Sequence, residues 1–274
     1  MSALPLRASA NDVPILLSEM AGAVAVLTLN RPMARNSLSE ALIAELHAAL
    51  NEIAKDGNVR AVVIAANGPA FSAGHDLKEL TARRGDADGG RAYFAKLMNA
   101  CSAMMQAIVH LPKPVVAGVQ GIATAAGCQL VASCDLAVAS EAASFATPGV
   151  DIGLFCSTPM VALSRNVPRK QAMEMLLTGE PVSAATAQGI GLINRVVAVG
   201  TERKSAIEFA HKVALKSAHT VKLGKSAFYR QAEMSLAEAY AYAAQVMTEN
   251  MMAADAEEGI GAFIEKRAPK WQDR

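Results

Sequence analysis

Several short segments of this chain are apolar almost from end to end, and they constrain its fold more than any other feature. VRAVVIAA (59–66), KPVVAGVQG (113–121) and DLAVAS (135–140) have this character, and INRVVAV (193–199) repeats it. Runs of this kind, without regular polar residues, are typical of strands buried on both faces of a parallel sheet. Because segments with helical spacing lie between them, we predict an α/β fold with a largely parallel sheet and helical crossovers.

The beginning of the chain predicts a β-hairpin and then a capped helix. VPILLSEM (13–20) and GAVAVLTL (22–29) are two strand-like segments joined by a short Ala-Gly turn. Ser37 and Glu40 have the spacing of a capping box, which predicts a helix start. Apolar residues then recur at helical intervals, at Leu42, Ile43, Leu46, Leu50 and Ile53.

Composition divides the chain into three parts. Residues 1–12 are short and polar, lack the apolar core of a signal peptide, and are expected to form a disordered tail. Residues 13–200 contain every strand candidate and form the predicted core. From 201 to 274 all segments have helical patterns, and their Ala- and Met-rich faces are more apolar than one chain needs. We therefore expect 201–274 to be a helical subdomain that packs against a neighbouring subunit.

Overall composition argues against several classes of protein. The chain has 274 residues, of which 52% are hydrophobic and 19% charged, with a net charge of +1. A net charge near zero argues against nucleic acid or an anionic membrane surface as the main partner. No apolar run approaches the roughly 20 residues that span a bilayer. Four cysteines lack CxxC spacing and share no ligand pattern with the histidines, so we expect reduced thiols and no metal site: Cys101, Cys128, Cys134 and Cys156.

Two segments share one design, in which a buried strand runs into a turn of small residues and then a helix start. They are VVIAANGPAFSAGHDLKEL (62–80) and PVVAGVQGIATAAGCQL (114–130). Helix N-termini present free N–H groups and favour negative charge. If the two turns meet, one N–H from each could hold a single oxygen as an oxyanion hole. The alternative is that the small residues only permit close packing of helix and sheet. Neither segment has a dinucleotide or P-loop motif.

Four separated motifs together resemble the crotonase (enoyl-CoA hydratase/isomerase) family, from about Val24 to the C-terminal GAFIEKR. The motifs are FSAGHDLKEL (71–80), KPVVAGVQGIATAAGCQLVASCDLAVAS (113–140), SFATPGVDIGL (144–154) and LLTGEPVSAATAQGIGLINRVV (176–197). Within the family, AAGCQLVASCD and SFATPGV are most similar to an animal subgroup of hydratase-domain-containing proteins.

The resemblance implies a fold, a ligand and an assembly. The fold is a spiral of ββα units with a C-terminal helical subdomain that packs in trimers, often paired into hexamers. The ligand is an acyl-CoA thioester, so that coenzyme A is part of the substrate and no other cofactor is expected. Family members are lyases or isomerases of fatty acid metabolism, located in the cytoplasm or, in a eukaryote, in the mitochondrial matrix. No nucleic acid and no membrane insertion are expected.

The family's site positions carry over residue by residue. Its two oxyanion N–H groups correspond to those of His75 and Ala126. The turn RPMARNSL resembles the wall of the CoA cleft, and Lys78 together with Phe263 and Lys266 of a neighbouring subunit matches positions that meet the nucleotide end of CoA. The full set of substrate-binding positions implied by the resemblance is Met33, Ala34, Arg35, Ala73, His75, Asp76, Leu77, Lys78, Ile122, Pro148, Phe263 and Lys266.

The sequence departs from the family at both acid positions. A hydratase of this family uses two glutamates to activate water and to deliver a proton, and the matching positions here are Gln129 and Gly149. An amide is not a general base at neutral pH, and glycine has no side chain. Each lost acid/base group typically costs about 10² to 10⁴ in rate. We therefore expect efficient hydration of 2-enoyl-CoA to be absent.

Several replacements for the missing acids are open from the sequence. If GVDIG is extended, Asp151 faces the same way as Gly149 and could act as the base; alternatively it is exposed or pairs structurally. Cys156 is expected to be a packed thiol, because no cationic neighbour in sequence activates it. Thr147 and Gly149 are expected to leave room for a water or a small anion such as bicarbonate. Two hypotheses remain, an enzyme that acts through a thioester enolate with an unidentified or exogenous base, and a non-catalytic acyl-CoA-binding or regulatory protein.

Overall fold

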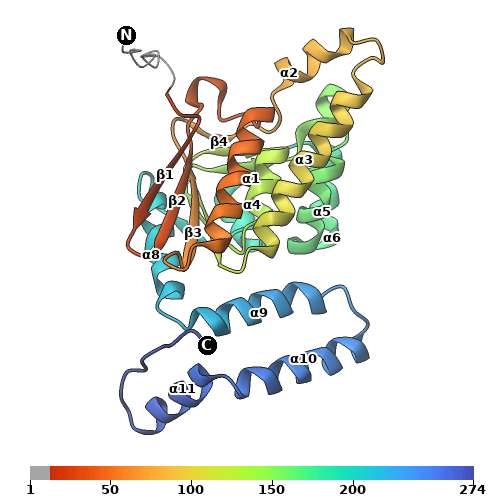
Figure 1. The fold of residues 1–274 in the computed structure, drawn as a ribbon. Coiled ribbons are helices and arrows are strands. Elements are labelled where there is room, and N and C mark those ends of the chain that lie inside the picture. The colour runs from red at the N-terminus through yellow and green to blue at the C-terminus, as the bar shows by residue number, and fades with distance from the viewer. Residues whose placement is uncertain (1–12) are drawn as a thin grey trace, which may run out of the picture.

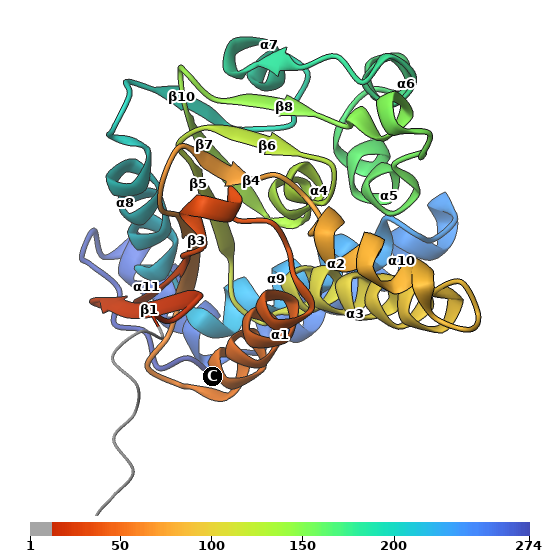
Figure 2. The same ribbon diagram turned by 90° about the horizontal axis from the view of Figure 1, so that it is seen from above.

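The computed structural model describes residues 13–274, and the tail predicted for residues 1–12 lies outside the described residues. Two sheets form the centre of the core (Figures 1 and 2). The larger sheet contains, in spatial order, β1 (Leu16–Ala21), β2 (Val24–Leu29), β3 (Ala61–Ala66), β5 (Val115–Val119), β7 (Leu136–Ser140) and β10 (Arg195–Val197). The smaller sheet contains β4 (Ala70–Ser72), β6 (Ile122–Thr124), β8 (Ser144–Ala146) and β9 (Val182–Ser183).

The order of the strands forms a spiral. Three pairs of consecutive strands are divided between the two sheets: β3 and β4, β5 and β6, and β7 and β8. In each pair the first strand belongs to the larger sheet and the second to the smaller sheet. Within each sheet these successive members are neighbours and run parallel. The predicted hairpin at the start is confirmed, since β1 and β2 pair antiparallel. The predicted parallel sheet with helical crossovers is therefore confirmed as well.

Helices occupy the connections and the end of the chain. They are α1 (Glu40–Lys55), α2 (Leu77–Ala82), α3 (Arg91–His110), α4 (Ala126–Ser133), α5 (Ser157–Asn166), α6 (Arg169–Thr178), α7 (Ala184–Gly189), α8 (Glu202–Ala214), α9 (Ala218–Gln231), α10 (Leu236–Met251) and α11 (Ala254–Ile264). Three short 3-10 turns are η1 (Pro32–Ala34), η2 (Arg83–Gly85) and η3 (Pro148–Ile152). None of the helices between residues 13 and 274 combines the length and apolar character that crossing a membrane requires.

Both faces of the larger sheet are buried at its central strands β2, β3, β5 and β7, as their apolar sequences predict. Along β3, Val62 and Ile64 belong to the main core with α1 and α3, while Val63 between them belongs to a second cluster with Ala206 and Ala210 of α8. This alternation follows from the two-residue period of a strand. All five apolar positions predicted for α1 are buried.

The start of α1 differs from the prediction. The N-cap is Ser39, whose side chain accepts a hydrogen bond from the Leu42 N–H at 3.2 Å. Ser37 instead donates from its hydroxyl to the Asp76 carboxylate at 3.1 Å. The predicted capping box of Ser37 and Glu40 is therefore wrong, because Ser37 is engaged by the loop that precedes α2.

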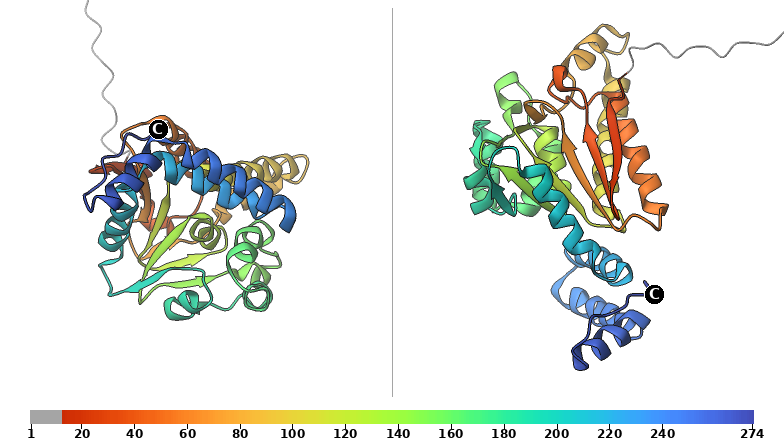
Figure 3. Two further views of the ribbon diagram at one scale, coloured as in Figure 1. Left: turned by 90° about the horizontal axis from the view of Figure 1, so that it is seen from below. Right: turned by 90° about the vertical axis from the view of Figure 1, so that its left-hand side faces the viewer.

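The helical part after Thr201 is divided between two places. Helix α8 lies against the larger sheet, whereas α9, α10 and α11 form a separate layer below the core (Figures 1 and 3). The Lys225 ammonium of α9 ties this layer to the core, since it donates to Asp135 at 2.7 Å, and the Tyr229 hydroxyl donates to the same carboxylate at 2.9 Å.

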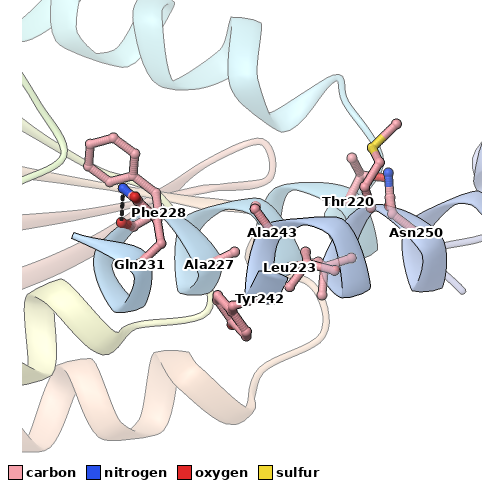
Figure 4. Close-up of a pocket in the computed structure, with 11 residues that line it drawn as sticks. Thr220, Leu223, Ala227, Phe228, Gln231, Tyr242, Ala243 and Asn250 are labelled. Carbon is pink, nitrogen blue, oxygen red and sulfur yellow. Dashed lines mark hydrogen bonds between the residues drawn. The ribbon is translucent and has the colours of Figure 1, made fainter. Parts of the chain in front are cut away.

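The layer presents much apolar surface. A groove of about 270 Å³ lies between α9 and α10, lined by side chains that include Leu223, Ala227, Tyr242 and Ala243 (Figure 4). The exposed large apolar residues of the layer are Phe228, Leu236, Tyr240, Met247, Met251, Met252, Ile260, Phe263 and Ile264.

Candidate functional site

The two small-residue turns meet in space. Strands β4 and β6 run parallel as neighbours, and the turn after each leads into a helix. Gly74, in the first turn, has φ +83°, and a Cβ at this residue would lie 3.2 Å from the Ala126 nitrogen and 3.0 Å from the Thr124 oxygen. Only glycine permits both this backbone conformation and this approach. The backbone around His75 therefore lies directly against the start of α4.

Two N–H groups at this junction have no acceptor within residues 13–274. The neighbours of His75 pair with Leu38, since the Leu38 N–H donates to Gly74 at 2.7 Å and the Asp76 N–H donates to Leu38 at 3.3 Å. In this pairing the N–H of His75 itself is left over. The N–H of Ala126 is the first of α4 and likewise has no acceptor inside the helix. The junction thus offers at least one free donor from each turn, and the N–H groups of Gly127 and Cys128 at the start of α4 also have no acceptor among residues 13–274.

The residue before α4 is held in a strained backbone conformation by two hydrogen bonds. Ala125, the residue before the helix, has φ 49° and ψ −118°, a conformation that residues with a Cβ rarely adopt. Such strain costs on the order of 1–3 kcal/mol and persists only where the surroundings enforce it. Here the Ala125 N–H donates to Ala146 at 2.9 Å, and the Ala125 oxygen accepts from Gln129 at 3.0 Å.

The loop that carries His75 is held by an ion pair. Asp76 accepts from Arg31 at 3.1 Å and from the Lys78 N–H at 3.1 Å, besides its bond from Ser37. Burial opposes ionisation of Asp76, but these hydrogen bonds outweigh it and lower the pKa of the carboxyl. Asp76 caps α2 and is fully engaged by the loop that it stabilises.

Gln129 and Gly149 stand at the two positions where the family pattern has glutamates, so neither carries an acid. Around the second, Gly149, other atoms leave little space for a side chain. A side chain at Gly149 would begin 3.0 Å from the Cys156 Sγ and 3.0 Å from the Leu154 oxygen. The Thr147 hydroxyl donates to Met175 at 2.8 Å. The Thr147 hydroxyl is therefore already engaged, and the position of a Cβ at Gly149 is tightly packed. Burial raises the pKa of the Cys156 thiol, opposed by a backbone hydrogen bond at Gly149, so this cysteine is a packed thiol.

Asp151 does not share a side with Gly149. The segment is the 3-10 turn η3, not an extended strand, so residues two apart point in different directions. The Asp151 carboxylate lies beside Gly179 at the end of α6, with Oδ2 3.0 Å from where a Cβ of Gly179 would stand. The expectation that rested on extended backbone is wrong for this reason.

The remaining positions implied by the resemblance are spread over the surface. Met33 is 98% exposed, and Arg35, Leu77, Lys78 and Ile122 are also exposed. Partly buried are Ala34, Ala73 and Pro148. Phe263 of α11 is 84% exposed, and α11 lies at the opposite end of the molecule from α2 (Figure 1). One chain thus does not bring Phe263 and Lys266 to the two turns.

No group of three or more metal-ligating side chains is assembled in the part of the chain that the structure describes. The groove between α9 and α10 is lined only by residues of those two helices (Figure 4).

Protonation of His75 is expected to destabilise the fold. Burial lowers the pKa of this imidazole from its ordinary value of 6.5. Below about pH 6.5 the unfolded state binds a proton at this imidazole, whereas the folded state stays neutral until a lower pH. The free energy of unfolding is therefore highest above pH 6.5 and decreases as pH falls toward the folded pKa. Urea unfolding from pH 7.5 to 5 should show a steeper loss of stability for the parent than for His75→Gln. Parallel curves would contradict a neutral, partly buried imidazole in the folded state.

Comparison with known proteins finds relatives along almost the whole chain. A family model described as "Enoyl-CoA hydratase/isomerase" matches residues 19–274. The "Enoyl-CoA hydratase domain-containing protein 3, mitochondrial" of Rattus norvegicus is 49% identical over 245 residues, which cover 89% of this chain and 80% of that protein. A solved enoyl-CoA hydratase of Mycobacterium smegmatis has a TM-score of 0.89 and 53% identity, over 94% of this chain and 99% of that chain. The human enoyl Coenzyme A hydratase domain-containing protein 3 has a TM-score of 0.89 and 45% identity, over 94% and 100% of the two chains.

Proposed function

This chain belongs to the enoyl-CoA hydratase/isomerase family, and we propose that it binds an acyl-CoA thioester whose carbonyl oxygen lies between the N–H groups of His75 and Ala126. The observation that carries the proposal is the convergence of two turns that each keep one free donor. Two fixed donors aimed at one oxygen stabilise the negative charge that develops on it, and one such donor is typically worth about 10² to 10³ in rate. The positive end of α4 adds to this effect.

The side chains restrict which reactions this arrangement supports. Hydration needs a group that activates water and a group that protonates the α-carbon, and the chain has Gln129 and Gly149 in those places. Cys156 fills the space at Gly149, and its thiol stays protonated at neutral pH because burial raises its pKa. We therefore expect enolate chemistry that needs little general base, such as loss of CO₂ from a malonyl-type thioester, and only slow hydration of crotonyl-CoA.

A second candidate is a non-catalytic acyl-CoA-binding or regulatory protein. It is favoured by the same filled position, because a thiol packed against Gly149 leaves no place for a replacement base there. The strained Ala125 and the free donors serve binding as well as catalysis. The two candidates differ only in whether a bound thioester reacts.

The rest of the ligand and the assembly follow the family pattern in this proposal. The exposed Met33 and Lys78 would face the CoA moiety, and Phe263 and Lys266 would come from a neighbouring subunit. The apolar surface of α9 to α11 supports a homotrimer or a dimer of trimers, since one chain leaves it uncovered. The name of the Rattus norvegicus relative places that protein in mitochondria, and we extend a mitochondrial location to this protein if it is eukaryotic, with the cytoplasm as the location otherwise.

Binding and turnover are tested on the same preparation. Butyryl-CoA at 100 times its Kd should add about 2.7 kcal/mol to the free energy of unfolding, measured by thermal denaturation, with free adenosine as the control. Crotonyl-CoA should give a similar shift while its conjugated thioester absorbance falls slowly or not at all. No stabilisation by any CoA ester would reject acyl-CoA binding, and rapid loss of absorbance would reject the absence of a working acid/base pair.

A further inference from the structure

After α11 the chain turns back and contacts two other parts of the molecule (Figure 1). We call residues 270–274 the strap. The N–H groups of Gln272 and Asp273 donate to the carboxylate of Asp255, in the first turn of α11, at 2.6 and 2.9 Å. In return the Asp255 N–H donates to the Arg274 oxygen at 3.1 Å. Asp255 is only 2% exposed, so the strap supplies the hydrogen bonds that a buried carboxylate requires.

The same strap is attached to the core and to the beginning of α9. The guanidinium of Arg60, the residue before β3, donates to both carboxylate oxygens of Asp273 at 2.7 and 3.0 Å. This carboxylate also accepts from the N–H of Ala218, the first residue of α9, at 2.8 Å. The Trp271 indole N–H donates to the oxygen of Leu215, which follows α8, at 2.9 Å. Paired hydrogen bonds between arginine and a carboxylate fix the geometry as well as the distance, so α11 is held at a defined place relative to the core.

The strap faces one side of α11 and leaves another side exposed. Asp255 and Gly259 are four residues apart and lie on the same side of the helix. The Trp271 ring packs on this side, since a Cβ at Gly259 would stand 3.2 Å from it. Phe263 is 84% exposed, and α10 is the element that α11 packs against most. The strap therefore adds the contacts that determine which side of α11 points outward.

The end of α11 is held in a backbone conformation that favours glycine. Lys266 has φ 56°, in the left-handed region. The Arg267 N–H donates to Ala262 at 3.0 Å, and the Arg267 guanidinium donates to the two oxygens of Glu258 at 2.6 and 2.9 Å. Glu258 also accepts from the N–H of Lys270 at 2.7 Å. The first residue of the strap is thus bound to the same carboxylate that orients the turn at Lys266.

We propose that Trp271 and Asp273 are positioning residues, which hold α11 so that Phe263 and Lys266 reach the nucleotide end of an acyl-CoA bound by a neighbouring subunit. This inference rests on the proposed function, which assigns Phe263 and Lys266 to that contact. Without the strap, α11 keeps its packing on α10 but loses its connection to Arg60 and to the start of α9. A rotation of α11 then moves both side chains away from the ligand of the other subunit.

The test measures the affinity of the full-length protein by calorimetry for butyryl-CoA and for butyryl-pantetheine, which has the same thioester but no nucleotide. The parent should bind butyryl-CoA more tightly. Trp271→Ala and Asp273→Ala should each weaken butyryl-CoA binding roughly tenfold, since a hydrogen bond to a charged group is typically worth that much. Both should leave the affinity for butyryl-pantetheine unchanged. The matched control is Glu208→Ala, which removes the carboxylate of an exposed ion pair on α8 and should change neither affinity.

The outcomes separate this inference from the proposed function. A parent that binds both thioesters equally would overturn the inference and leave the thioester site standing, whereas a parent that binds neither would reject both. Folded variants that keep the parent's affinity for butyryl-CoA, or that lose both ligands equally, would contradict positioning of α11. Size-exclusion chromatography shows whether the variants keep the parent's assembly, and loss of assembly would assign the strap to the interface instead. If Trp271→Ala does not fold, Asp273→Ala decides, because it leaves the indole in place.

Discussion

Replacing Gly127 by alanine is expected to destabilise the protein by about 3 kcal/mol and to abolish acyl-CoA binding. A Cβ at Gly127 would stand 2.2 Å from the Ser72 carbonyl oxygen and 2.8 Å from the Ser72 carbonyl carbon. These are backbone atoms of β4, so α4 and β4 must separate. Because His75 follows β4 and Ala126 begins α4, the same movement pulls apart the two N–H groups of the proposed oxyanion hole.

Thermal denaturation and a binding titration with butyryl-CoA check this expectation. A loss of this size corresponds to a fall in Tm of roughly 6 to 12 °C for a domain of this length. The matched control is Gly57→Ala, since a Cβ at Gly57 meets nothing within 4 Å. A folded Gly127→Ala variant with the parent's affinity would show that the contact between α4 and β4 does not set the geometry of the site.

Restoring both acids together with space for the second is expected to create hydratase activity. The variant combines Gln129→Glu, Gly149→Glu and Cys156→Ala, and it should hydrate crotonyl-CoA at least about 10²-fold faster than the parent. The third change is required because the Cys156 Sγ lies 3.0 Å from where the new Cβ begins. Single acid changes should gain little, since groups that act as a unit are strongly non-additive. The measurement is loss of the conjugated thioester absorbance.

The controls for this experiment distinguish steric obstruction at Gly149 from the effect of the two acid groups. Gly149→Glu alone should be less stable than Gly149→Glu with Cys156→Ala, because the thiol 3.0 Å from the new Cβ is removed only in the second variant, whereas the Leu154 backbone oxygen, also at 3.0 Å, is present in both. Two carboxylates placed close together in a buried site repel, so one of their pKa values should rise, and the pH profile should show it. A folded, CoA-binding combined variant with no gain would mean that the missing acids are not what limits hydration. A parent already as fast would mean that an unrecognised base is present.

The sequence predicts the architecture well because burial on both faces leaves a strong pattern. Strands β3, β5 and β7 are apolar at nearly every position, and this follows from contact with α1 and α3 on one face and α8 on the other. The motif resemblance is confirmed by the family match and by relatives of the same animal subgroup. Strands β4, β6 and β8 were not predicted, because three residues each are too short to show a period.

The details of the site depend on contacts that are distant in sequence. Whether Ser37 or Ser39 caps α1 is decided by Asp76, which is 39 residues from Ser37. The filling of the Gly149 position by Cys156 depends on how the loop after η3 folds back, and composition carries no signal for it. The strained backbone of Ala125 likewise leaves no signal in the sequence, where this residue is one of two adjacent alanines. The close contact at Gly127 leaves one trace, a glycine in the first turn of a helix, where it has poor intrinsic propensity.

The proposed polarisation of a thioester carbonyl between His75 and Ala126 is tested most directly by infrared difference spectroscopy of bound [1-¹³C]butyryl-CoA. The carbonyl band should move to lower wavenumber on binding to the parent, because two hydrogen bonds weaken the C=O bond. Ala126→Pro removes the N–H at the first position of α4, so part of the shift should be lost, whereas Ala126→Gly should keep it. A bound ligand whose carbonyl band stays at its free position in the parent, or is equally shifted in folded Ala126→Pro, would contradict the oxyanion hole.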